Sequence, residues 1–135
     1  MKLGWRTAAA VLIAAAGLAT AGAVARPIAA SLHSRVAYGT LDPNSVPARI
    51  DYCGRRYYAD AGATWTREKA ASTSDPSFQA SWREIGRTDG GTPYYAMVVP
   101  DTVRRVFSPP IPCTMLVYLR VGPDVYSVYP LSGGP

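Results

Sequence analysis

The chain has 135 residues and a formal net charge of +5 at pH 7, from 14 basic and 9 acidic side chains. Residues 26–135, which follow a hydrophobic stretch, suffice for one small domain and are too few for two domains or for a core plus a large lidded cleft. The basic residues occur as isolated pairs, Arg55-Arg56 and Arg104-Arg105, so nucleic-acid binding is not expected.

Residues 1–25 predict export from the cytoplasm. Lys2 and Arg6 form a basic start, an apolar run rich in Ala follows, and small residues at 19–21 and 23–25 offer two cleavage sites. As a helix the run of about 19 residues would measure about 28 Å, close to a hydrocarbon core of about 30 Å. A retained transmembrane anchor is therefore the alternative to a signal peptide, and the Ala- and Gly-rich composition favours cleavage. Under either interpretation the positive-inside rule places residues 26–135 outside the cytoplasm.

Residues 26–47 show little periodicity and end in a Pro- and Asn-bearing stretch, so we interpret them as a tether with at most one short helical or extended piece. His33, the only histidine, lies there as a solvated residue, which excludes a Ser-His-Asp or Cys-His site inside the domain. No His/Cys/Asp cluster has the spacing of metal ligands, so neither a metal nor a cofactor is expected. The folded domain is predicted to span residues 48–135.

The first hairpin is predicted from two strand-like runs, 49–53 and 56–59, around a turn at Gly54. Residues 60–79 are polar and small and predict a long loop with room for one helical turn at 66–71.

A second hairpin pairs 82–86 with 94–99 across an Asp89-Gly90-Gly91 turn, whose glycines supply positive φ angles. Residues 101–107 form a short strand or helical turn, and the proline-rich stretch 108–112 is an extended connector.

The third hairpin pairs 114–121 with 125–129 across a Gly-Pro-Asp turn. Strict alternation places one set of its side chains in the core: Cys113, Met115, Val117, Leu119 and Val121. The expected fold is mainly β, a small antiparallel sheet or barrel of about six strands that follows the N-terminal hydrophobic helix.

Two cysteines in an exported chain predict one disulfide, Cys53–Cys113, which would join the first and third hairpins. Closing a loop of about 60 residues removes on the order of 4 kcal/mol of unfolded-state entropy. A redox role would need a C-x-x-C motif, which the chain lacks, so the pair is interpreted as structural.

Tyrosine and arginine offer the strongest sign of a binding surface. Strand alternation forces the adjacent pairs Tyr57-Tyr58 and Tyr94-Tyr95 to place one ring on each face, so some rings are exposed unless both faces are covered. Exposed Tyr beside Arg is typical of recognition surfaces. The predicted ligand-binding residues are Arg55, Arg56, Tyr57, Tyr58 and Trp65.

Two strings, 51–58 (DYCGRRYY) and 116–135 (LVYLRVGPDVYSVYPLSGGP), resemble those of small exported or membrane-anchored proteins of unknown function from GC-rich Gram-positive bacteria. The resemblance covers the ends of the domain, implies export and paired cysteines, and carries no activity, cofactor or catalytic residue.

Three functions remain open. The leading hypothesis is a non-catalytic binding module at the cell envelope, with an envelope component, an acidic polymer or a protein as partner and with membrane contact through residues 1–25 if these are retained. A small hydrolase that uses a carboxylate pair such as Asp51 and Glu84 is the second. The third is a structural or assembly protein that packs against a membrane partner through an exposed apolar patch.

Overall fold

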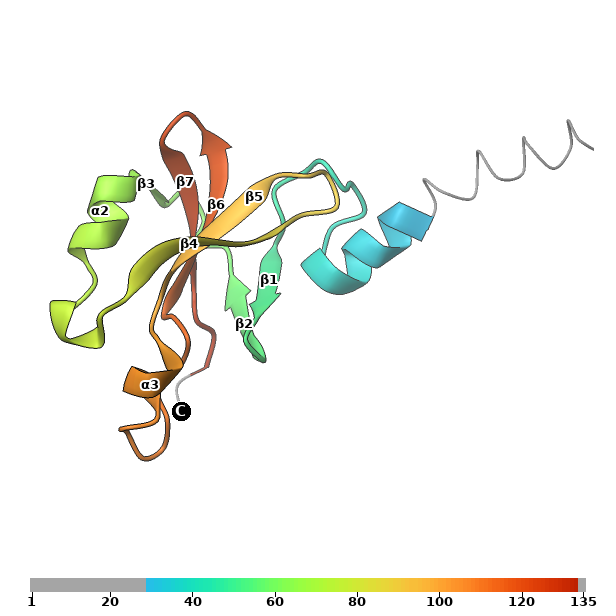
Figure 1. The fold of residues 1–135 in the computed structure, drawn as a ribbon. Helices are drawn as coiled ribbons and strands as arrows, with labels where there is room; N and C mark the ends of the chain where they lie inside the picture. The colour runs from blue at the N-terminus through green and yellow to red at the C-terminus, as the bar shows by residue number, and fades with distance from the viewer. Residues whose placement is uncertain (1–28, 134–135) are drawn as a thin grey trace, which may run out of the picture.

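The computed structural model describes residues 29–133, which fold into a helix at 29–38 followed by short strands and helices. The further elements, in chain order, are β1 (Arg49–Tyr52), β2 (Arg55–Tyr58), β3 (Thr64–Trp65), α2 (Arg67–Ser72), the 3-10 helix η1 (Pro76–Phe78), β4 (Ser81–Arg87), β5 (Pro93–Val98), α3 (Asp101–Arg104), β6 (Leu116–Gly122) and β7 (Val125–Pro130). Figure 1 shows α2 beside the end of the sheet that carries β3 and β7, and α3 at the opposite end of the molecule from the β6–β7 turn.

The strands form two antiparallel sheets. β1 and β2 pair only with each other, and the other five follow the order β3-β7-β6-β5-β4. The prediction of a mainly β fold is confirmed, but the prediction of one sheet or barrel is wrong. A single bridge between Tyr57 and Leu131 is the β-type pairing that joins β2 to the chain after β7, so the hairpin lies against the larger sheet instead of extending it.

Both faces of the larger sheet are covered, because its central strands carry apolar side chains on each side. Toward the β1–β2 hairpin they contribute Val117 and Leu119 of β6 and Tyr129 of β7, which pack against Ile50 and Tyr57. On the opposite face a second cluster joins one helix to the sheet through Ala70 of α2, Tyr118, Tyr126 and Val128. The hairpin, the sheet and α2 thus form three layers.

The alternation predicted for residues 113–121 holds only in part. Cys113, Val117 and Leu119 are buried as predicted, whereas Met115 is 62% exposed and Val121 is 45% exposed. Regular pairing begins only at Leu116, so Met115 lies outside the pleat, and the register of β6 shifts between Arg120 and Gly122. Strand alternation therefore does not apply to either position.

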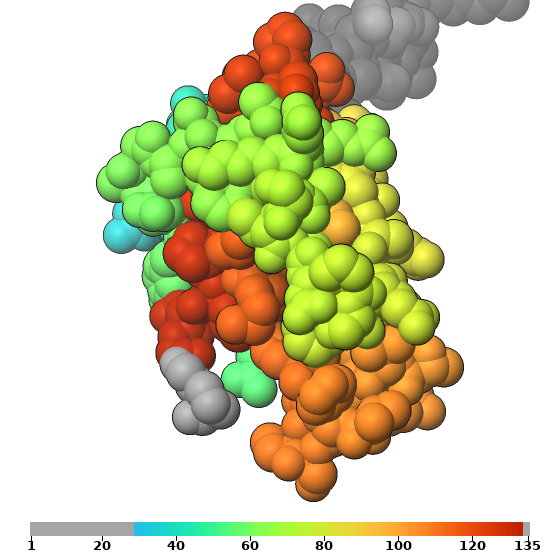
Figure 2. Space-filling view, turned by 90° about the vertical axis from the view of Figure 1, so that its left-hand side faces the viewer, coloured from blue at the N-terminus to red at the C-terminus, as the bar shows by residue number. Residues whose placement is uncertain are grey.

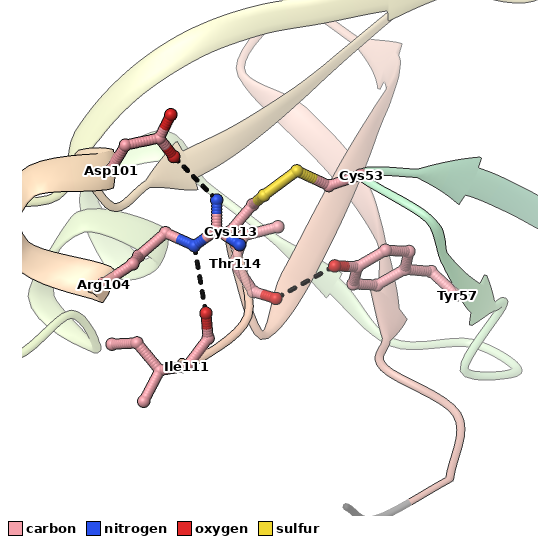
Figure 3. Close-up of a disulfide and its surroundings, with 7 residues drawn as sticks. All are labelled: Cys53, Tyr57, Asp101, Arg104, Ile111, Cys113 and Thr114. Atoms are coloured by element: carbon pink, nitrogen blue, oxygen red, sulfur yellow. Dashed lines mark hydrogen bonds and ion pairs between the residues drawn. A yellow bond between two sulfur atoms is a disulfide. The ribbon is translucent and has the colours of Figure 1, made fainter. Parts of the chain in front are cut away.

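The first hairpin closes through Cys53 and Gly54, which have φ angles of 54° and 70°. Two consecutive residues with positive φ are the signature of a two-residue type I′ turn. The hairpin predicted around Gly54 is confirmed, although Cys53 belongs to the turn and not to the first strand. The turn also carries the predicted disulfide, since Cys53 bonds to Cys113 with a Cα–Cα distance of 6.4 Å (Figure 3). The bond fastens the hairpin tip to the segment that leads into β6.

Residues 29–47, within the predicted tether, contact the domain at both ends. Ser34 is fully buried and donates to Asp89 Oδ2 over 2.6 Å, and His33 Nδ1 lies 2.8 Å from the same oxygen while its side chain is 64% exposed. Near the other end, the Tyr129 hydroxyl donates to the carbonyl oxygen of Pro47 over 2.7 Å. These contacts hold the segment against the β4–β5 turn and the buried end of β7.

The predicted signal peptide or anchor at 1–25 lies outside the described residues. Within residues 29–133, no helix is long and apolar enough to cross a membrane.

Candidate functional site

The predicted Tyr-Arg surface is not assembled as one patch, and Tyr57 is not part of any surface. Its side chain is fully buried between the sheets, and its hydroxyl donates to the carbonyl oxygen of Thr114 over 2.9 Å (Figure 3). Burial raises the pKa of the Tyr57 hydroxyl to about 12, while the nearby charges of Arg55 and Arg104 act in the opposite direction. The prediction of Tyr57 as a ligand contact is therefore corrected, because it belongs to the core.

The other predicted residues lie on different sides of the larger sheet. Arg55, Arg56 and Tyr58 are exposed on the hairpin, and the Arg56 guanidinium pairs with Asp51 over 3.0 Å. Trp65, by contrast, packs into the cluster beneath α2, with the Lys69 ammonium 4.6 Å from the centre of its ring. The five residues therefore do not converge on one ligand.

The carboxylates proposed for a hydrolase are also apart. Asp51 lies in the two-stranded sheet and pairs with Arg56, whereas Glu84 lies in β4 and pairs with Arg87 over 2.8 Å. Neither of them lines any of three cavities in the described part of the chain. A pair that cannot share a substrate does not supply the general acid and base that glycoside hydrolysis requires.

A different feature has the form of a ligand site: an apolar groove of about 260 Å³ on the α2 face of the sheet. Figure 2 views this face, where α2 and η1 lie above the segment that runs from α3 into β6. One side of the groove is formed by Ala70, Thr73, Ser74, Asp75 and Phe78. The sheet contributes Met97, Leu116 and Tyr118, with Val99 directly after β5, and the other side is formed by Ile111, Pro112, Thr114 and Met115.

The α2 side of the groove is held in place by local capping. Thr66 caps α2, since its hydroxyl accepts from the Lys69 N–H over 3.2 Å, and Asp124 in the β6–β7 turn accepts from the Arg67 N–H over 3.1 Å. Asp75 begins η1 in the same way by accepting from the Ser77 N–H over 2.8 Å, and this hydrogen bond is the main reason why the pKa of Asp75 is lowered. Side-chain oxygens at helix starts satisfy N–H groups that have no partner within the helix.

Aromatic rings support the sheet side of the groove. The Tyr118 ring centre lies 5.3 Å from that of Trp82 and 6.0 Å from that of Trp65, and burial raises the pKa of the Tyr118 hydroxyl. Rings at these separations pack favourably in tilted and edge-to-face geometries. Tyr118 thus links the groove directly to both tryptophans.

The rim of the groove is apolar and partly open to solvent. Met115 is 62% exposed, and Phe78 makes an edge-to-face contact with Phe107 at 6.0 Å between ring centres. Phe107 and its neighbour Val106 are themselves 41% and 80% exposed. Apolar side chains gathered around a concave site favour binding of an apolar ligand.

Charge is unevenly placed around the groove. At the Ile111 end, Arg104 donates through Nε to the Ile111 carbonyl oxygen over 3.0 Å and pairs through a terminal nitrogen with Asp101 over 2.8 Å (Figure 3). Arg105 follows it and is exposed. The acidic side chain on the lining, Asp75, belongs to the η1 side.

The sequence analysis did not predict this groove, although the sequence does indicate the start of η1, which forms part of one side. The dipeptide Asp75-Pro76 is a helix-start signal within the predicted loop, because Asp is a favoured cap and Pro a favoured first residue. The rest of the lining comes from β5, β6 and the connector before β6, and only the tertiary fold brings these together.

No family model, curated protein or solved structure matches this chain. Within residues 29–133, no three His, Cys, Asp or Glu side chains lie together as a metal site would require. The walls of the groove offer apolar contact and a few hydroxyls, with charged side chains at its ends.

Proposed function

We propose that the protein is a non-catalytic binding module of the cell envelope and that the groove beneath α2 takes an apolar chain. The observation that carries the proposal is the groove itself, which is lined mainly by apolar side chains and is open at a rim containing Met115. Its volume of about 260 Å³ lies just below the range of about 300–1,000 Å³ typical of pockets for drug-sized ligands. This size suits a single chain or ring.

An extracytoplasmic position supports the same proposal. The disulfide is compatible with an oxidising compartment. The composition of residues 1–25 favours export, after which the protein is either secreted or anchored at the outer face of the membrane. At the envelope, amphiphiles are abundant ligands for a small apolar groove.

The first test is a chain-length series of neutral alcohols from hexanol to decanol, followed by tryptophan fluorescence because Tyr118 contacts Trp65 and Trp82. Each methylene buried contributes about 0.8 kcal/mol, so affinity is expected to rise about four-fold per added carbon until the groove is filled. Equal affinity along the series would contradict binding in an apolar groove.

The matched variants are Met115→Asp, which places a charge on the rim, and Val36→Asp, which places one on an exposed residue of the helix at 29–38, outside the lining. We expect the first to weaken decanol binding at least ten-fold and the second to change it less than two-fold, because a carboxylate beside the chain must be desolvated. Equal effects of the two variants would place the ligand elsewhere. Co-purification of another protein with the wild type, lost in the Met115 variant and without any alcohol binding, would favour the assembly role.

A further inference from the structure

The adjacent arginines Arg104 and Arg105 lie next to the apolar groove. A hollow of about 300 Å³ is lined by Asp101, Arg104, Arg105 and Pro110. Ile111 and Pro112, the next two residues of the chain, line the groove. Arg104 Nε donates to the Ile111 carbonyl oxygen, so a residue that lines the hollow is hydrogen-bonded directly to a residue that lines the groove.

The hollow carries a net positive charge. Asp101 pairs with Arg104, and no hydrogen bond or ion pair to the Arg105 side chain occurs among residues 29–133. Positive charge therefore lies beside the Ile111 end of the groove.

The opposite side repels an anion. Asp75 is on the η1 side of the lining, and its hydrogen bond to the Ser77 N–H favours the charged carboxylate. A ligand with one charged end would therefore enter the groove with an anionic end toward Arg105 and away from Asp75.

We infer that the ligand is an anionic amphiphile whose chain lies in the groove and whose carboxylate or phosphate head lies at Arg105, with Arg104 beside it. This inference rests on the proposed function and adds the charge of the ligand and its orientation. Arginine suits either head group, since its planar guanidinium donates two hydrogen bonds to carboxylate or phosphate oxygens.

The test compares three ligands of equal chain length at low salt: 1-decanol, decanoate and decyl phosphate. We expect at least one anion to bind about five-fold more tightly than the alcohol and to lose that preference in 0.5 M NaCl, because salt screens exposed charge. The anion that binds more tightly identifies the head group. Equal affinity for all three ligands overturns the inference and leaves the proposed function standing, whereas no binding of any of them overturns the proposed function.

The matched variants are Arg105→Gln and Arg83→Gln. Both arginines are exposed, but Arg83 lies in β4 and its Nε donates to the Ser81 hydroxyl, outside both cavities. We expect Arg105→Gln to remove most of the preference for the anion while decanol affinity stays within two-fold, and Arg83→Gln to keep the preference. If both variants lose it equally, the effect is one of overall charge and the inference is wrong.

Discussion

Neighbouring tyrosines in this chain have opposite roles because of strand alternation. Tyr57 points into the core and its hydroxyl donates to Thr114, whereas Tyr58 is 42% exposed on the outer face of the hairpin. The sequence predicted that one ring of each pair lies on each face, and this is confirmed for Tyr94 and Tyr95, which pack into different clusters. The pattern alone does not reveal which face the rest of the chain covers.

Tyr57→Phe is expected to lower the free energy of unfolding by about 1–3 kcal/mol, because the buried Thr114 carbonyl oxygen loses its hydrogen-bond donor. Tyr58→Phe is the matched control and is expected to change it by less than about 0.5 kcal/mol. Urea denaturation followed by fluorescence measures both. Equal effects would mean that the buried hydrogen bond contributes nothing specific.

The hairpins were the features most easily predicted from the sequence, and the groove, which several elements form together, was the least predictable. Alternation and turn residues indicated all three hairpins, and the helical turn predicted at 66–71 is observed as α2. β3, with only two residues, has too short a pattern to predict. The groove could not be predicted either, because it depends on how the α2–η1 segment lies over β5 and β6, which is a matter of tertiary contact.

The contact between the helix at 29–38 and the rest of the domain is expected to depend on pH. Its docking depends on Asp89, which accepts from the buried Ser34 hydroxyl and contacts His33, and the Ser34 hydrogen bond is the main reason why the pKa of Asp89 is lowered. A carboxyl group whose pKa is lowered on folding stabilises the folded state above its ordinary pKa, near 4. That stabilisation is lost as the pH falls through the lower value in the folded protein.

Asp89→Asn should therefore speed amide hydrogen exchange in residues 29–38 at neutral pH, and the wild type should show the same loss of protection only below about pH 4. Asp60→Asn is the control, since no hydrogen bond to the Asp60 side chain occurs in the described part of the chain. Unchanged exchange in the Asp89 variant would show that other contacts dock the helix.

For the whole molecule, the disulfide connects two sheets that otherwise share one β-bridge and a packed core. Cys53 and Cys113 are 60 residues apart in sequence, and their bond holds the hairpin against the segment that forms one wall of the groove. The pairing itself was predictable from export and the cysteine count. The separation into two sheets was not, since it depends on where strand pairing stops.

Replacing both cysteines by serine is expected to lower the free energy of unfolding by about 2–4 kcal/mol, because the unfolded chain gains the freedom of a long open loop. Chemical denaturation with and without a reducing agent measures the difference: the wild type should respond to reduction and the double variant should not. A wild type that is equally stable in both conditions would show that the packed core alone holds the hairpin.

The most direct measurement of the central claim is a ¹⁵N–¹H correlation spectrum of the intact protein during titration with decanoate. The binding account predicts saturable shifts confined to groove residues such as Thr73, Val99 and Met115 and to Arg105 beside them. Shifts centred on Arg56 and Tyr58 of the hairpin, or no saturable shifts at all, would contradict it.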